Sequence, residues 1–196
     1  YNPDANFDSG CSSHEGPEWY VSTSGDDING DGSLESPFSS IQRGLTAAGS
    51  TDTVLVSSGT YTENIIWPET SSITLRGIDR ETTIIDGGGI GPVITLTDSV
   101  ENANISRFTI TNGHFEEDVN NPVYQRAGGI NIGTNIYSAT TAVLSDLHIT
   151  NNTGYSGGGI YCATGSFFDL SYSVIDQNTA SQGGGVFISG RFTIDS

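Results

Sequence analysis

A glycine-rich hexapeptide that recurs at a fixed spacing constrains the fold of this chain more than any other sequence feature. Gly157–Cys162 (GGGIYC) returns 26 positions later as Gly183–Ile188 (GGGVFI), and a looser copy covers Gly128–Ile132 (GGINI). Glycines ahead of an apolar-x-apolar triplet suit a turn where two backbones approach closely before the chain enters a strand. The fixed spacing predicts a repeat architecture.

Two series of apolar positions extend this repeat over most of the chain. The triplets of the first series begin at Val54, Ile73, Ile94, Ile130, Ile160 and Val186. The second series consists of Ile65, Ile85, Ile110, Ile149, Ile175 and Ile194. Two short strands per period of about 20 to 26 residues, with no helical pattern between them, are typical of a solenoid. The sequence therefore predicts an all-β chain, a parallel β-helix of about five to six coils.

Uneven spacings locate insertions in this repeat. The stretch from Ile110 to Gly128 is 18 residues long, against 9 from Ile149 to Gly158, which predicts a loop around residues 114–126. Insertions in solenoids fall on turns and often on one face. We therefore expect Phe115, Glu116 and Glu117 to be candidate partner-binding residues.

Charge and hydropathy exclude several partners. The net charge is −17, and the six basic residues are all arginines. No extended basic patch is expected, so nucleic acid and anionic membranes are unlikely partners. No apolar run reaches the roughly 18 residues of a membrane span. The acidic composition, rich in Gly, Ser, Thr and Asn, predicts a secreted protein at a cell surface.

Residues 1–18 show no strand or helix period and are interpreted as a tail or linker, followed by one β-helix domain over 19–196. An amphipathic helix is predicted over 37–48, because Ser36-Pro37 is a typical helix start and Gly49 a typical stop. Its use would be to cover the open end of the first coil. No closing element follows Gly190–Ser196, so we expect further coils, or another copy of the chain, to continue the stack.

Oxygen-bearing side chains suggest calcium as a cofactor at two places. In the tail they alternate at Asp4, Asn6 and Asp8. In the following loop, four residues match positions 1, 3, 5 and 9 of a calcium loop, namely Asp27, Asn29, Asp31 and Glu35. Phe38 stands where the bidentate twelfth ligand belongs. A polar linker and an ordinary Asp/Gly turn are the alternatives.

Residues 20–67 resemble the N-terminal cap of right-handed parallel β-helix proteins of the pectate-lyase-like superfamily. The residues that carry this resemblance include Tyr20-Val21-Ser22, Ser36-Pro37-Phe38, Asp52-Thr53-Val54 and Gly59-Thr60-Tyr61. The glycine-led coils resemble repeats of bacterial surface β-helices, including polymorphic outer membrane proteins and related adhesins. The tail resembles the end of an Asp/Asn-rich repeat of marine bacterial surface proteins. These resemblances imply the fold and leave the activity open.

Residues for catalysis are not evident from the sequence, and no catalytic residue is assigned. β-Elimination needs a base and a cation, and the arginines look scattered. Hydrolysis of a glycosidic bond needs two convergent carboxylates, and Asp146, Asp169 and Asp176 fall at different phases of the repeat. His148 lies between Leu147 and Ile149, so it is expected to point outward into solvent.

The outward positions of the glycine-led strands include Asn131, Tyr161 and Phe187. Coil stacking predicts that Tyr161 and Phe187 lie one above the other, as a platform for a sugar or a partner. The alternative is that the 114–126 loop covers them. Asparagines at 112, 151 or 152, and 178 predict an internal amide ladder that satisfies turn carbonyls.

Together these patterns favour a non-catalytic, extracellular structural or adhesive β-helix module of a bacterial surface protein or filament, with glycans as further partners. The alternatives are a carbohydrate-active enzyme, either a polysaccharide lyase or a glycoside hydrolase, and a carbohydrate-binding module.

Overall fold

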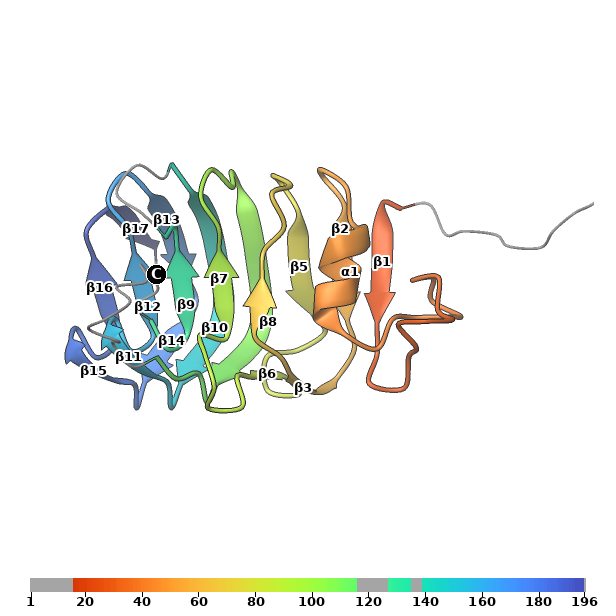
Figure 1. Cartoon of the computed structure of the whole chain (residues 1–196), viewed down its shortest axis with the longest axis horizontal. Helices are drawn as coiled ribbons and strands as arrows, with labels where there is room; N and C mark the ends of the chain where they lie inside the picture. The colour runs from red at the N-terminus through yellow and green to blue at the C-terminus, as the bar shows by residue number, and fades with distance from the viewer. Residues whose placement is uncertain (1–15, 116–126, 135–138, 196) are drawn as a thin grey trace, which may run out of the picture.

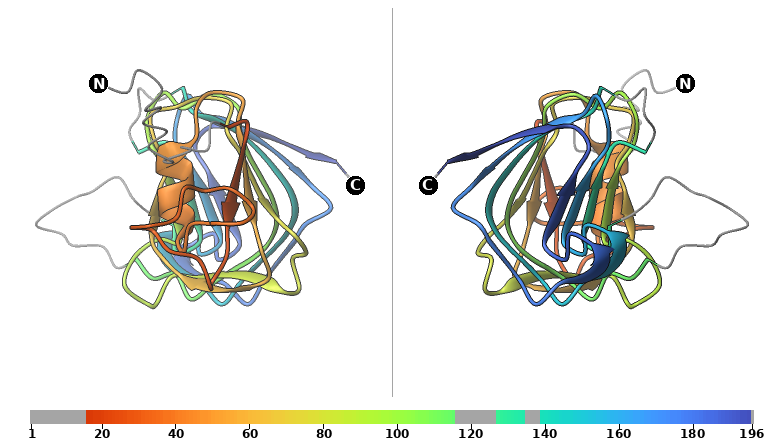
Figure 2. Two further views of the ribbon diagram at one scale, coloured as in Figure 1. Left: turned by 90° about the vertical axis from the view of Figure 1, so that its right-hand side faces the viewer. Right: turned by 90° about the vertical axis from the view of Figure 1, so that its left-hand side faces the viewer.

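The computed structural model describes residues 16–115, 127–134 and 139–195. Within them the chain winds into a stack of coils whose strands run parallel, with one short helix at the N-terminal end (Figure 1). Seen end-on, most coils follow a similar outline, and the C-terminal strand diverges from it (Figure 2). The predicted all-β, parallel β-helix with a capping helix is confirmed.

Three faces make up each coil. The first face contains β1 (Glu18–Val21), β2 (Thr53–Val56), β5 (Thr74–Gly77), β13 (Phe167–Ser171), β17 (Arg191–Asp195) and the beginnings of β8 (Ala103–Thr111) and β10 (Thr141–Thr150). The second face contains β3 (Gly59–Thr62), β6 (Thr83–Asp86), β14 (Val174–Asp176) and the ends of β8 and β10. The third face contains β4 (Ile65–Ile66), β7 (Ile94–Leu96), β9 (Ile130–Ile132), β12 (Ile160–Cys162) and β16 (Val186–Ile188). Between the second and third faces, β11 (Thr153–Ser156) pairs with β15 (Thr179–Gln182).

The register of the strands follows the sequence repeat. Ile160 lies between Ile130 and Val186 on the third face, and Ile149 lies between Ile110 and Ile175 on the second. Side chains that alternate inward stack into one continuous apolar core from Val21 to Leu170. Full burial of a side chain of this size contributes about 1.5–3 kcal/mol. The core therefore holds successive coils together along the stack.

The helix at the N-terminal end is shorter than predicted. α1 covers Ile41–Ala47, and Ser40 is its N-cap, with the hydroxyl accepting a hydrogen bond from the Arg43 amide at 3.2 Å. The predicted start at Ser36-Pro37 is wrong because Phe38 is held extended beside β1. The Phe38 amide donates to the Tyr20 carbonyl at 3.0 Å, and the Ser22 amide donates to the Phe38 carbonyl at 2.9 Å. The segment therefore covers the outer edge of β1 while α1 covers the apolar end.

Glu63 ties this cap to the first coil. Its two carboxylate oxygens accept hydrogen bonds from the amides of Ile41 and Gln42 at 2.8 and 2.9 Å. Burial raises the pKa of Glu63, against the lowering effect of these two amides. The side chain thus satisfies backbone donors at the start of α1 that would otherwise have no partner.

The predicted amide ladder lies at the turn after the second face. Asn152 is buried, its side-chain oxygen accepts from the Gly113 amide, and its side-chain nitrogen donates to the carbonyls of Ile110 and Thr150. Asn178 continues the ladder in the next coil by donating to the Ile149 carbonyl. Asn112 and Asn151 instead adopt left-handed backbone conformations at the corner, with φ of 56° and 55°. The ladder therefore belongs to Asn152 and Asn178.

Cys162 points into the core, at the inward position that it shares with Ile132 and Ile188. Burial raises the pKa of its thiol to about 11. Because the thiolate is the reactive form, we expect Cys162 to resist disulfide reagents in the folded protein at pH 8. The chain has one other cysteine, Cys11, which is replaced so that only Cys162 is counted. In this Cys11→Ser variant, colorimetric titration should find no fast-reacting thiol until urea is added, and then one thiol per chain. Rapid reaction without urea would show that this part of the core opens.

The one helix of the described residues is α1, and at seven residues it is too short to cross a membrane.

Candidate functional site

One corner of the coil, between the first and second faces, carries charged and aromatic side chains on a strained backbone. Arg107, Asp146 and Tyr172 occupy it in three successive coils, each following a serine of one register column, Ser106, Ser145 and Ser171. Their φ angles are 64°, 52° and 50°, in the left-handed region that L-residues other than glycine rarely adopt. We call these three residues the corner column. Strain of this kind at a polar surface is a reason to look for function.

Two arginines converge beside the corner column. Arg76 and Arg107 line one cavity of about 260 Å³ together with Leu55, Gly77 and Ile78. The Arg107 guanidinium donates to the Ile78 carbonyl at 3.5 Å, and neither arginine forms an ion pair within the described part of the chain. In a chain of net charge −17, two unpaired guanidiniums in one cavity form a local site for an anion. The sequence interpretation of scattered arginines is wrong here.

Arg80 adds a third guanidinium and bridges several coils. Its side chain extends from the turn between β5 and β6. Its Nη1 lies 3.2 Å from Oδ1 of Asp146 and donates a hydrogen bond to the Tyr172 carbonyl at 3.1 Å. It also pairs with Glu81 at 3.1 Å. With Tyr172 and Val174 it lines a second cavity, of about 350 Å³. Three of the six arginines therefore gather at this corner.

A histidine and an aspartate lie next to these groups on the second face. Nε2 of His148 in β10 lies 3.0 Å from Oδ1 of Asp176 in β14. The Thr150 hydroxyl, followed by the His148 imidazole, lowers the pKa of Asp176, so this carboxylate is ionised at neutral pH. Asp176 is thus placed to hold the imidazole in one orientation, as in a base and orienter pair.

The neighbouring strand connects this pair to Arg80. Thr109 lies beside His148 in the register of β8 and β10, and its hydroxyl donates to the Arg80 carbonyl at 2.8 Å. Asp146, the partner of Arg80, lies two residues before His148 in the same strand. The imidazole, the Arg80 guanidinium and the two aspartates therefore form one continuous polar surface. The side chain of His148 is 30% exposed and that of Asp176 is 43% exposed, so a ligand can reach both.

The corner also offers a surface on which a sugar ring can stack. Tyr172 is 71% exposed, and Val174, which lines the same cavity, is 44% exposed. Exposed aromatic rings supply apolar contact area with a polar tip, which suits a ligand with an apolar face and polar edges. The surface thus combines an imidazole, guanidiniums and an exposed aromatic ring.

The loop predicted to bind calcium uses its carboxylates within the turn. Asp27 accepts from the amides of Ser39 and Ser40 at 2.8 and 3.0 Å, and Asp31 accepts from the Ser33 amide at 2.9 Å. The Asn29 side chain donates to Asp26. Among the described residues, no group of three or more His, Cys, Asp or Glu side chains could hold a metal ion. Calcium at Asp27, Asn29, Asp31 and Glu35 stays a prediction, and Asp4, Asn6 and Asp8 lie outside the described residues.

The predicted aromatic platform is mostly covered. The rings of Tyr161 and Phe187 are stacked at 5.9 Å with an interplanar angle of 11°, as the repeat predicts. Tyr161 is only 8% exposed because Ala127 and Ala163 pack against it, and Asn131 is fully buried, with its side-chain oxygen bonded to the Ala127 amide. The face of Tyr161 is therefore not open to a sugar in this structure. The alternative, that the 114–126 loop covers these rings, involves residues 116–126, which lie outside the described residues.

The predicted partner-binding loop is described only where it begins. The Phe115 amide donates to the Thr153 carbonyl at 2.8 Å, so the loop starts out bound to the neighbouring coil. Glu116 and Glu117 lie outside the described residues. Partner binding by this loop stays a prediction.

Two of the solved structures that this chain resembles are pectin methylesterases. One is a pectin methylesterase in complex with a hexasaccharide, with 15% identity and a TM-score of 0.46, covering 78% of this chain and 54% of that chain. The other is a pectin methylesterase from carrot, with 15% identity and a TM-score of 0.48, covering 94% of this chain and 65% of that chain. The chain thus spans less than two thirds of either structure. No protein-family model and no curated protein matches it.

Both similar structures are carbohydrate-active enzymes, and this finding contradicts the prediction of a non-catalytic structural or adhesive module. The prediction that the chain is not an enzyme is corrected with it, in favour of the carbohydrate-active alternative. The resemblance to surface adhesins stays a prediction. The chain's own strand pairing establishes its fold, and its own side chains decide its chemistry. The strand pairing of the described residues gives the chain a parallel β-helix fold.

Proposed function

We propose that this chain is a secreted carbohydrate-active enzyme that cleaves an acidic, uronate-containing polysaccharide by β-elimination at the corner between the first and second faces. The observation that carries the proposal is the His148–Asp176 pair at 3.0 Å, on the same surface as the guanidinium of Arg80. β-Elimination needs a base for the proton next to the carboxylate and cations that neutralise this carboxylate. The corner supplies both.

His148 is the proposed base. Its imidazole takes the proton from the carbon next to the uronate carboxylate, and the electron pair of the broken C–H bond forms a C=C double bond. The bond between the adjacent carbon and the glycosidic oxygen breaks, its electron pair goes to that oxygen, and the leaving oxygen takes a proton from solvent. Asp176 keeps the imidazole oriented and stabilises the imidazolium that forms. The reaction shortens the polysaccharide and leaves an unsaturated uronate at one new end.

Arg76 and Arg107 are proposed to hold the carboxylate. Guanidinium groups pair with carboxylates in a bidentate geometry, and these two share one cavity without a protein carboxylate between them. Charge neutralisation stabilises the carbanion-like transition state. Arg80 is a weaker candidate for this role because Asp146 and Glu81 already engage its guanidinium. Exposed Tyr172 supplies the stacking surface for a neighbouring sugar.

The direct test is turnover. We expect the protein to raise the ultraviolet absorbance of at least one polyuronate among polygalacturonate, alginate and a polyglucuronate, because each elimination creates a conjugated double bond. An Arg107→Gln variant should lower kcat/KM by about 100-fold, the loss of a charge-assisted hydrogen-bonding group in a transition state. An Arg43→Gln variant is the matched control, since Arg43 lies over the Phe38 ring at the N-terminal cap.

Other products would contradict the elimination. New reducing ends without the double bond would indicate hydrolysis, and release of an alcohol from an esterified polysaccharide would indicate ester hydrolysis at the same corner. Equal activity of the Arg107→Gln and Arg43→Gln variants would remove the arginine cavity from the reaction.

A further inference from the structure

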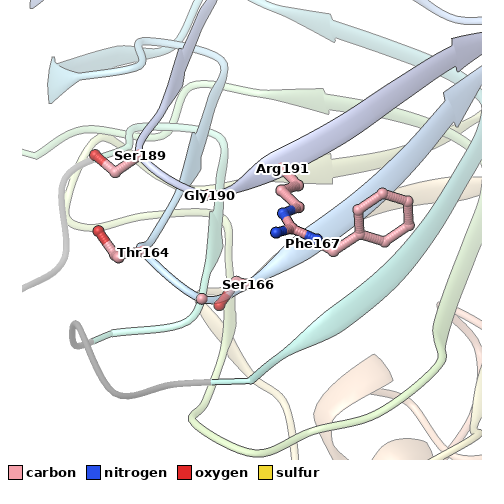
Figure 3. Close-up of a pocket in the computed structure, with 7 residues that line it drawn as sticks. Thr164, Ser166, Phe167, Ser189, Gly190 and Arg191 are labelled. Carbon is pink, nitrogen blue, oxygen red and sulfur yellow. The ribbon is translucent and has the colours of Figure 1, made fainter.

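A separate cavity lies at the opposite corner of the coil, between the third and first faces. Two successive turns, at residues 164–166 and 189–191, enclose a volume of about 510 Å³ lined by Thr164, Gly165, Ser166, Phe167, Ser189, Gly190 and Arg191 (Figure 3). We propose that this cavity is a second carbohydrate site, which binds one sugar residue that carries a carboxylate or sulfate group. The site is independent of the proposed reaction at the other corner.

The walls of this cavity are preformed by backbone contacts between the two turns. The Arg191 amide donates to the Ser166 carbonyl at 3.0 Å, and the Ser189 amide donates to the Cys162 carbonyl at 2.9 Å. A Cβ atom at Gly190 would lie 2.3 Å from the Ser166 carbonyl oxygen and 2.5 Å from that of Ala163. Glycine is therefore required for this close approach, and the turns cannot separate without losing both hydrogen bonds. Preformed walls reduce the entropic cost of binding a small ligand.

The chemistry of the lining selects a sugar with an anionic group. Arg191 is exposed, forms no ion pair with the other described residues, and extends beside Phe167 in Figure 3. Its guanidinium suits a carboxylate or a sulfate, which accept two parallel hydrogen bonds. The hydroxyls of Thr164 and Ser189 can donate to and accept from sugar hydroxyls. A volume of about 510 Å³ lies within the usual range of small-ligand sites, roughly 300–1,000 Å³.

Ser166 provides a second, independent sign of a ligand. The residue is 1% exposed, and its hydroxyl has no hydrogen-bond partner among the described residues. A buried hydroxyl without a partner costs stability, so natural structures rarely keep one. Ser166 is among the residues that line this cavity, where a ligand hydroxyl, or a water that the ligand orders, would supply the partner.

The position of the cavity separates it from the proposed reaction site. β13 begins at Phe167, in the cavity, and ends at Ser171, next to Tyr172 of the corner column. Five strand residues at about 3.3 Å each place the two sites roughly 16 Å apart across the first face. The two can therefore bind different sugar residues, and loss of one need not affect the other.

The experiment is a titration of the ¹⁵N-labelled whole chain, followed by backbone amide shifts. Glucuronic acid is expected to change the chemical shifts of the Gly165, Gly190 and Arg191 amides. Glucose is expected to bind with an affinity at least about tenfold lower in the same titration. Arg191→Gln should weaken glucuronic acid binding by about tenfold or more. Arg76→Gln, at the other corner, should leave these shifts unchanged. The same amides should respond to a sulfated monosaccharide, and this arm shows which anionic group binds more tightly.

Several outcomes would overturn this proposal. Equal shifts by glucose and glucuronic acid would exclude recognition of the anionic group, and equal shifts by inorganic sulfate and a sulfated sugar would reduce the cavity to a simple anion site. Unchanged binding in Arg191→Gln would place the ligand elsewhere. Ser166→Ala tests the buried hydroxyl: we expect weaker glucuronic acid binding with no loss of thermal stability. Failure of polyuronate cleavage leaves all of these readouts intact, so the two proposals can fail separately.

Discussion

Replacing His148 with alanine is expected to lower kcat for polyuronate cleavage by about 10²–10⁴-fold, the usual contribution of a general base. The expected loss falls mainly on kcat, since the arginines that hold the carboxylate stay in place. The ultraviolet assay for the unsaturated product measures it. Asp176→Asn should give a smaller decrease, because the amide keeps a hydrogen bond to His148 but loses the charge that stabilises the imidazolium.

His114→Ala is the matched control for this substitution. His114 is also a half-buried histidine, but it lies at the turn towards the third face, beside Thr153. Its replacement should leave kcat within about twofold of the unmodified protein, since it touches none of the groups at the corner column. A His148→Ala variant that folds and keeps its rate would remove the imidazole from the mechanism.

Replacing Asn152 with alanine is expected to cause the largest loss of stability, about 3–5 kcal/mol. The substitution leaves the Gly113 amide and the Ile110 carbonyl buried without their side-chain partners, and each such group costs about 1–3 kcal/mol. Asn178 loses its hydrogen bond from the Asn152 side chain as well. For a domain of this size, the loss corresponds to a decrease of roughly 6–20 °C in Tm. Thermal unfolding followed by circular dichroism provides the measurement.

Asn151→Gly is the control for this prediction. Asn151 is adjacent in sequence but exposed, and glycine accepts its φ of 55° without strain. We expect a change in Tm of no more than about 2 °C. Equal destabilisation by the two substitutions would show that the turn conformation, and not the buried ladder, stabilises this part of the stack.

The coil architecture was predictable because local sequence patterns determine it. Glycines at 158 and 159 lie where a Cβ would meet the backbone of the next coil, and the apolar triplets after them pair in the register that the repeat implies. The start of α1 was not predictable from the cap signal at Ser36-Pro37. Phe38 pairs with Tyr20 instead, a contact between segments that are distant in sequence.

The candidate site was harder to find for a physical reason. Arg80 lies in an irregular turn, and its contact with Asp146 joins residues 66 positions apart. Repeat phase indicates which face a strand residue occupies, but not where a long side chain reaches. One signal was available: Asp176 follows His148 by 28 positions, one 26-residue period plus two, so this spacing alone could have placed both side chains outward on adjacent coils. In the sequence, a solvated histidine and a histidine that a carboxylate orients look the same until the carboxylate partner is located.

The left-handed backbone of the corner column lowers the stability of the fold at the proposed reaction site. A residue other than glycine in this conformation costs about 1–2 kcal/mol, and Arg107, Asp146 and Tyr172 each bear that penalty. Glycine at any of the three positions would remove this strain, so selection for thermal stability alone would favour replacing these residues. A descendant selected only for thermal stability would be expected to keep the parallel coils and to lose the side chains of the proposed reaction site.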